Sequence, residues 1–179
     1  MLFGTEVFEI EILKSIQAFL GCGFMDFIMP KISMLGNGGF LWIVCGLLLI
    51  INKKHRKYGF LLLLGLLVGV ILGNALFKNI FARPRPYQLL DGITLIIESP
   101  LDYSFPSGHT LSSFIAAFTL RHFNKKIGGW SVFVASLIAF SRLYLFVHYP
   151  TDILGGVLLS FLIYRFILYV SSQIAKRNS

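Results

Sequence analysis

The sequence predicts an all-α integral membrane protein, a bundle of about six transmembrane helices. Hydrophobic residues make up 56% of the 179-residue chain and charged residues only 13%, with a mean hydropathy of +0.77. Soluble domains typically carry about 25% charged residues. The length accommodates one membrane domain, residues 1–179, because each crossing needs ~20 apolar residues. These observations exclude a disordered chain, an ordinary soluble enzyme and a nucleic-acid-binding module.

Residues 1–35 have the least regular pattern of the chain. Acidic and basic side chains interrupt the apolar residues, and Pro30 interrupts a helix. We expect a weak first crossing here. The alternative is an amphipathic helix on the membrane surface, followed by a short membrane helix.

Five further spans follow from uncharged or nearly uncharged runs. The first contains Gly36-Asn37-Gly38-Gly39, which predicts an irregular outer end. The third is short and must extend back into the preceding residues to cross. The last two each contain one arginine, and long basic side chains reach an interface from within a helix. The five runs are residues 32–52, 58–77, 110–120, 127–147 and 153–175.

The distribution of basic residues orients the predicted helices. Nine of the sixteen Lys and Arg residues fall in three short stretches without an acidic residue, residues 53–57, 121–126 and 176–177. Such stretches are typical of cytoplasmic loops. The sequence therefore predicts a polar site at the extracytoplasmic face of a cell membrane. Alternating helices bring these ionisable residues together there: Lys78, Arg83, Arg85, His109, Arg142, His148 and Asp152.

Residues 106–110 predict an anion-binding helix start. Pro106 and Ser107 favour the beginning of a helix, with the Ser107 side chain as its N-cap. The free N–H groups of Gly108 and His109 would then face the outer side, where the helix dipole favours a negative charge. Phosphate is the natural ligand of such a helix start. A capped helix with an incidental histidine is the alternative interpretation.

Residues 141–152 add a second histidine and two charged groups. Arg142 precedes His148 by about 9 Å along a helix and so reaches toward the same outer site. Asp152 follows His148 by four residues, close enough in a helical turn to accept a hydrogen bond from the imidazole. That bond would leave the other ring nitrogen free as a nucleophile or a ligand. His109, His148 and Asp152 could also bind zinc, but three or more cations in one site favour a multiply charged anion.

These residues resemble the three-part signature of the type 2 phosphatidic acid phosphatase (PAP2) superfamily of lipid phosphate phosphatases. All three parts occur in order within residues 78–152, and the helix pattern extends the resemblance over nearly the whole chain. The tandem Arg83-Pro84-Arg85-Pro86 offers two registers, of which the spacing selects Arg85. The parts are Lys78, six residues, Arg85-Pro86; Pro106-Ser107-Gly108-His109; and Ser141-Arg142, five residues, His148, three residues, Asp152.

The resemblance implies a metal-independent hydrolase that uses no cofactor. His148 would attack phosphorus and form a phosphohistidine, Asp152 would orient its ring, and His109 would protonate the leaving oxygen. The groups expected to bind the phosphate are Lys78, Arg85, Ser107, Gly108 and Arg142.

The resemblance also implies a lipid phosphate as substrate and membrane lipids as surroundings. Small bacterial relatives act on undecaprenyl diphosphate, phosphatidylglycerophosphate, phosphatidic acid or lipid A phosphates. An outward-facing site in a bacterial cell membrane favours undecaprenyl diphosphate, which is released on that side during cell-wall synthesis. The alternative of another class is a lipid phosphate transporter without hydrolysis. Transporters more often have an internal repeat or paired broken helices near the midplane, and the sequence has neither.

Overall fold

The computed structural model describes residues 4–90 and 92–177, so residues 1–3, 91 and 178–179 of the predicted domain lie outside it. The described residues form helices and connecting segments without a strand, which confirms the all-α prediction. The α-helices are α1 (Glu6–Leu20), α2 (Gly23–Met34), α3 (Phe40–Ile51), α4 (Arg56–Gly69), α5 (Lys78–Phe81), α6 (Gly108–Phe123), α7 (Lys125–Tyr144) and α8 (Pro150–Arg177).

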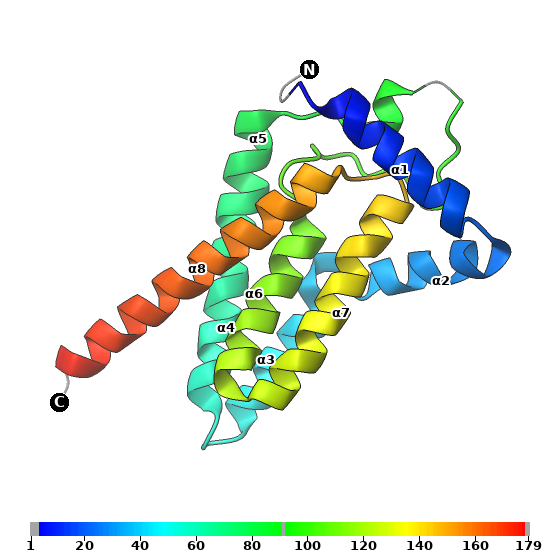
Figure 1. Cartoon of the computed structure of the whole chain (residues 1–179). Helices are drawn as coiled ribbons and strands as arrows, with labels where there is room; N and C mark the ends of the chain where they lie inside the picture. Colours follow the sequence, from blue (N-terminus) through cyan, green and yellow to red (C-terminus); the bar gives the residue numbers. More distant parts are fainter. Residues whose placement is uncertain (1–3, 91, 178–179) are drawn as a thin grey trace.

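Three shorter helical segments connect these helices. The 3-10 helix η1 (Asn37–Gly39) joins α2 to α3, and the 3-10 helix η3 (Pro86–Leu89) follows α5. The π-helix η2 (Val70–Phe77) joins α4 to α5 without a break. Figure 1 shows α4, η2 and α5 as one long rod along the bundle.

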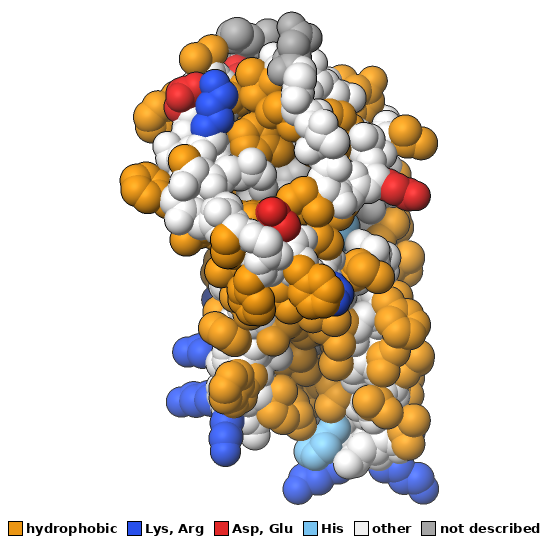
Figure 2. Space-filling view, turned by 90° about the vertical axis from the view of Figure 1, so that its right-hand side faces the viewer, with side chains coloured by type: hydrophobic (Ala, Val, Ile, Leu, Met, Phe, Trp, Pro, Cys, Tyr) orange, Lys and Arg blue, Asp and Glu red, His pale blue; other side chains and the backbone are white. Residues whose placement is uncertain are grey.

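Helix α6 forms the centre of the bundle. It packs against α7, α8 and α4, and Figure 1 shows it between them. Leu111, Ile115 and Ala116 of α6 are buried in the main hydrophobic core, together with Leu62 of α4 and Ile138 of α7. On the outside, Figure 2 shows apolar side chains over much of the visible surface of the bundle. A surface of this kind suits contact with lipid hydrocarbon.

The described helices form about six units, roughly the predicted number. Helix α6 has 16 residues and lies inside the bundle; the α2–α3 pair, α4–α5, α7 and α8 surround it, and α1 is the unit that does not cross. The α2–α3 pair is together long and apolar enough to cross a membrane, and it is bent by 43° at the glycine-rich segment, where the sequence predicts an irregular end. Within the described residues, three helices are by themselves long and apolar enough to cross a membrane: Arg56–Leu89, Lys125–Tyr144 and Pro150–Arg177.

Residues 5–35 do not form the single crossing expected from the sequence. They form two helices, α1 and α2, separated at Gly21 and Cys22, and α1 is not among the helices that could cross a membrane by length and composition. Figure 1 shows α1 lying across the end of the bundle, near the end of α7 and the beginning of α8. The physical reason is charge: Glu6 and Glu9 are buried against Arg83 at this end instead of facing hydrocarbon.

Helix ends place the motif residues at this end of the bundle. As predicted, Ser107 is the N-cap of α6, and its Oγ accepts a hydrogen bond from the Thr110 N–H at 3.4 Å. Ala82 (φ +41°) ends α5, and Phe146 (φ +59°) follows α7. The left-handed region is unfavourable for residues with a side chain. These two residues turn the chain sharply just before Arg83 and His148.

The basic stretches lie at the opposite end. Residues 53–57 connect α3 to α4, and residues 121–126 connect α6 to α7. Figure 2 shows Lys and Arg side chains gathered at this lower end of the bundle. The alternation of helices therefore separates a basic end from an end that carries the motif residues, as the sequence predicted.

Candidate active site

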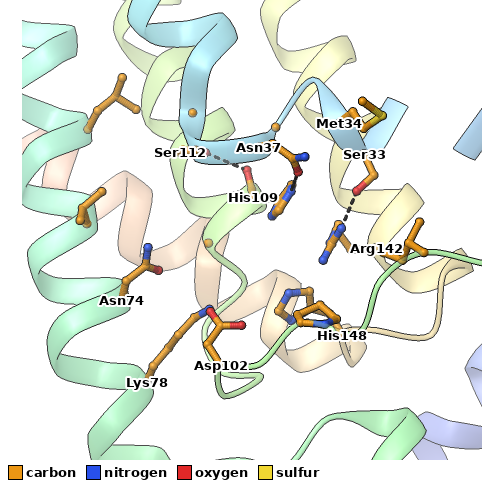
Figure 3. Close-up of a pocket in the computed structure, with 18 of the residues that line it drawn as sticks. Ser33, Met34, Asn37, Asn74, Lys78, Asp102, His109, Ser112, Arg142 and His148 are labelled. Atoms are coloured by element: carbon orange, nitrogen blue, oxygen red, sulfur yellow. Dashed lines mark hydrogen bonds and ion pairs between the residues drawn. The ribbon is translucent and has the colours of Figure 1, made fainter. Parts of the chain in front are cut away.

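A cavity of about 980 Å³ opens at the end of the bundle opposite the basic stretches. Figure 3 shows its polar side, on which charged, histidine and amide side chains face one another. Its other side is apolar and includes Ile43, Leu63, Leu66, Leu67 and Val70. Ile43, Leu67 and Val70 are also exposed on the outside of the bundle. The cavity therefore extends from a charged interior to the surface that suits lipid.

Three of the predicted cations line this cavity. The side chains of Lys78, Arg85 and Arg142 are buried, although each forms part of the cavity wall. Arg142 Nη1 donates to Ser33 Oγ at 2.5 Å, whereas its buried Nε has no hydrogen-bond partner within the described ranges. An unpaired buried N–H group costs ~1–3 kcal/mol. An anion in the cavity would supply the missing acceptor.

Asp102 supplies a carboxylate to the same cations. Its Oδ1 accepts from Arg85 Nη2 at 2.6 Å, and its Oδ2 forms an ion pair with Lys78 Nζ. Burial raises the pKa of Asp102, but the hydrogen bond and charge of Lys78 and the charge of Arg85 outweigh it and lower the pKa to about 2. Asp102 is therefore ionised at neutral pH and neutralises two groups that could otherwise bind phosphate.

His148 and Asp152 form the hydrogen-bonded pair that their spacing predicted. His148 Nδ1 lies 3.2 Å from Asp152 Oδ2, and both residues are buried. Because the carboxylate accepts a hydrogen bond from Nδ1–H, the proton stays on Nδ1 and Nε2 keeps its lone pair. Nε2 lies 3.3 Å from Arg85 Nη1. Burial lowers the pKa of His148 well below its usual 6.5, and the charges of Arg85 and Arg142 lower it further. The imidazole is therefore neutral at pH 7 and able to act as a nucleophile.

Three further hydrogen-bond donors hold the Asp152 carboxylate in place. Oδ2 also accepts hydrogen bonds from Ser104 Oγ and from the Tyr149 N–H, the latter at 2.8 Å. Oδ1 accepts from Arg83 Nη1 at 2.6 Å. The two oxygens of Asp152 thus have different partners: Oδ1 faces Arg83 and Oδ2 faces His148. These separate partners fix both the orientation of the carboxylate and the tautomer of the histidine.

His109 enters the cavity from the beginning of α6. Its Nε2 lies 2.8 Å from Asn37 Oδ1, and Figure 3 shows its ring on the same side of the cavity as Arg142 and His148. Gly108 also lines the cavity. The N–H groups of Gly108 and His109 precede the first intrahelical bond of α6, from the Leu111 N–H to the Ser107 carbonyl. They are therefore available to an anion.

Two predicted residues occupy positions beside the cavity. Ser107 is buried and its hydroxyl bonds Thr110, so it caps the helix and is not part of the cavity wall within the described residues. Arg83 is buried behind Asp152 and pairs with Glu9 at 2.6 Å. The structure thus places Arg85 and not Arg83 in the cavity wall, and Arg85 is the residue that the six-residue spacing selects.

The described residues 4–90 and 92–177 contain no group of three or more His, Cys, Asp or Glu side chains able to hold a metal ion. His109, His148 and Asp152 therefore do not form the zinc site considered as an alternative.

Sequence reasoning missed several residues of the site. Asp102, Asn37, Ser33 and Ser104 each contact a predicted residue, and all four lie outside the three motifs. Asp102 is one of three carboxylates in the loop of residues 87–105, and the sequence does not distinguish it from Asp91 and Glu98. The others could not be found from spacing, because their contacts join segments distant in sequence.

Fold and site together define a class of protein: a helical membrane protein with a cationic cavity suited to a phosphate group on a lipid. Residues 39–176 match the PAP2 superfamily, and the chain belongs to this superfamily. A Sulfolobus acidocaldarius protein described as an undecaprenyl-diphosphatase is 32% identical over 93% of this chain and 78% of its own length.

Two solved structures share the fold over most of the chain. The transmembrane PAP2-type phosphatidylglycerolphosphate phosphatase from Bacillus subtilis has a TM-score of 0.76 and 26% identity, with 96% of this chain and 88% of that chain covered. LpxE from Aquifex aeolicus has a TM-score of 0.77 and 28% identity, with 89% and 93% covered.

Proposed function

We propose that this protein is a lipid phosphatase that removes phosphate from a lipid diphosphate through a phosphohistidine intermediate. One observation carries the proposal. A histidine whose Nδ1 is held by a buried carboxylate faces a cluster of cations, inside a cavity that opens toward the lipid-facing surface. Such a cavity can hold a charged headgroup while the lipid tail stays in the bilayer.

In the first step, His148 Nε2 attacks phosphorus in line with the oxygen that leads to the lipid. The new N–P bond forms as the P–O bond breaks, and His109 donates its proton to the leaving oxygen. In the second step, His109 removes a proton from water, and the oxygen of this water attacks the phosphohistidine. The N–P bond breaks, inorganic phosphate is released, and both histidines return to their starting states.

The cations and the start of α6 stabilise the charge on the phosphoryl oxygens. Lys78, Arg85 and Arg142 line the cavity, and the N–H groups of Gly108 and His109 lie at the positive end of the helix dipole. Ser107 contributes by capping this helix start. Donors that are positioned before the reaction need no reorganisation as charge builds up.

Undecaprenyl diphosphate is the lipid we propose. Support comes from the apolar side of the cavity, which suits a long hydrocarbon chain, and from the name of the Sulfolobus acidocaldarius relative. The cavity recognises phosphate by charge and the tail by apolar contact. Phosphatidylglycerophosphate, phosphatidic acid and lipid A phosphates are therefore the comparisons that an assay must include.

We place the reaction at the extracytoplasmic face of a cell membrane and without a metal ion. The orientation is supported by the basic end of the bundle, which lies opposite the cavity. Metal independence is supported by the donor set: the three cations outnumber Asp102, the carboxylate paired with two of them, so they disfavour a divalent cation, and they can neutralise the phosphoryl oxygens once Asp102 is displaced.

The test is phosphate release by the purified protein in detergent with EDTA present. The substrates are undecaprenyl diphosphate, the three other lipids and a soluble phosphate ester, and the inactive control is His148→Ala. We expect release from undecaprenyl diphosphate well above the others and none from the variant. Release that requires added zinc would refute metal independence. A folded protein that binds phosphate but releases none would favour transport without hydrolysis.

A further inference from the structure

Helix α1 lies outside the three motifs and outside the residues that match the superfamily, yet it is joined to the candidate site. Two of its carboxylates are buried, Glu6 with 1% and Glu9 with 3% of the residue exposed. A third carboxylate, Glu11, is 62% exposed and pairs with Lys14 on the same helix. A buried carboxylate is costly unless it is paired, so the two inward-facing residues call for a specific explanation.

Glu9 holds the beginning of α8. Its Oε1 accepts hydrogen bonds from the Thr151 N–H at 2.8 Å and from Thr151 Oγ1 at 2.7 Å. Thr151 is the second residue of α8, and the first N–H groups of a helix have no partner within it. A carboxylate is also favourable at the positive end of the helix dipole. Glu9 therefore caps α8 from another helix.

The other oxygen of Glu9 holds Arg83. Glu9 Oε2 accepts from Arg83 Nη2 at 2.6 Å, and Arg83 Nη1 donates to Asp152 Oδ1 at 2.6 Å. Arg83 is fully buried, and its guanidinium stacks on the Tyr149 ring at 3.9 Å from the ring centroid. Contacts thus run without interruption from Glu9 through Arg83 and Asp152 to His148.

We propose that Glu9 is a positioning residue for the His148–Asp152 pair. It acts in two ways, by holding the helix start that carries Asp152 and by sharing the charge of Arg83. This inference rests on the proposed function, in which His148 is the nucleophile. It assigns to α1 a role in positioning the nucleophile, although α1 lies outside the three motifs and outside the residues that match the superfamily.

The separate partners of the two Asp152 oxygens explain why it matters that Glu9 shares the charge of Arg83. Arg83 binds Oδ1 and leaves Oδ2 to His148, as long as Glu9 takes the other end of the guanidinium. Without the Glu9 charge, Arg83 would interact more strongly with Asp152 and draw the carboxylate away from the imidazole. The histidine would lose its orientation, while Lys78, Arg85 and Arg142 would keep their places in the cavity.

The test compares Glu9→Gln with the matched control Glu11→Gln, which removes the same charge from an exposed position of the same helix. We expect Glu9→Gln to lower kcat about 10- to 100-fold, the size of effect that a misplaced reacting group produces. KM should stay near the wild-type value because the phosphate-binding cations are unchanged. Glu11→Gln should match the wild type in both constants.

Two inhibitors distinguish positioning from general damage. Orthovanadate mimics the transition state by accepting a fifth ligand from the nucleophile, whereas orthophosphate is held by the cations and the start of α6 without a bond to the nucleophile. Glu9→Gln should weaken inhibition by vanadate about tenfold or more and leave inhibition by phosphate unchanged. If Glu9→Gln does not fold, Thr151→Val takes its place. It removes the hydroxyl contacts to Glu9 and Arg83 without changing the shape of the side chain.

The outcomes separate this proposal from the proposed function. If the wild-type protein dephosphorylates lipid and Glu9→Gln behaves like Glu11→Gln, the positioning role is overturned. If vanadate and phosphate affinity fall together, Glu9 maintains the whole site, and the positioning role is again overturned. If the wild-type protein releases no phosphate from any lipid, the proposed function fails, and that result is visible before any variant is compared.

Discussion

Asp102 binds the cations that a phosphate group would need, and we predict that Asp102→Asn tightens the binding of inorganic phosphate. In the structure its carboxylate pairs with Lys78 and with Arg85, so a phosphate group must displace it. The carboxylate remains charged above about pH 4 because its pKa is lowered to about 2. The cost of displacing the Asp102 carboxylate therefore opposes phosphate binding over the whole pH range of a usual assay.

The expected change in the inhibition constant for phosphate follows from the two ion pairs of Asp102 and from their exposure to solvent. Hydrogen bonds to charged groups contribute ~1.5–3 kcal/mol when buried, and exposed pairs contribute ~1 kcal/mol or less. The Asp102 side chain is 53% exposed while its partners are buried, so the competing interaction is about 1.4 kcal/mol. Its removal corresponds to a roughly tenfold lower inhibition constant for phosphate.

The assay is competitive inhibition of lipid dephosphorylation by orthophosphate, followed through the dephosphorylated lipid. Thermal unfolding gives a second readout: the variant should have a lower Tm without phosphate and a larger increase in Tm when phosphate is added. Glu98→Gln is the control, because it removes an exposed negative charge at the cavity rim. An unchanged or raised inhibition constant in Asp102→Asn would show that Asp102 organises the cations and does not compete with phosphate.

Three further predictions concern other parts of the site. Asn37→Ala should lower kcat about tenfold for lipid substrates, because the side chain that bonds His109 Nε2 is lost. The loss should be smaller for p-nitrophenyl phosphate, whose leaving group needs no proton, and an equal loss would refute a role through His109. Because the pKa of His148 is well below 6.5, kcat/KM should not fall as the pH decreases from about 7 to about 6. A fall with a midpoint near 6.5 would show that His148 titrates normally. Leu90→Cys should react with an impermeant maleimide on intact cells, and reaction only after lysis would invert the proposed orientation.

The class of fold and most of the charged residues of the site could be predicted from the sequence. Long apolar runs force a membrane bundle because their side chains avoid water, and each predicted run between residues 58 and 175 lies mostly or wholly within a helical segment. The contacts predicted from residue spacing within single elements are also present in the structure. Asp152 lies one helical turn from His148, and Ser107 caps the helix that begins at Gly108.

The path of residues 5–35 could not be predicted in the same way. Charges within an apolar segment are compatible with a weak span and with a surface helix, and the local pattern does not distinguish them. The distinction came from Arg83, which lies more than seventy residues away in sequence and pairs with Glu9. A buried arginine between carboxylates stabilises α1 across the end of the bundle, whereas a crossing would expose those carboxylates to hydrocarbon.

The sequence by itself determined which chemical groups this protein carries and at which end of its helices they lie. Hydrophobicity sets where a chain crosses a membrane, and short-range spacing sets which residues share a helical turn. Only the tertiary structure decided how those groups are paired: Asp102 with Lys78 and Arg85, Asn37 with His109, and Glu9 with Arg83. Pairings of this kind join distant segments, and they depend on how helices pack in three dimensions and not on any local pattern.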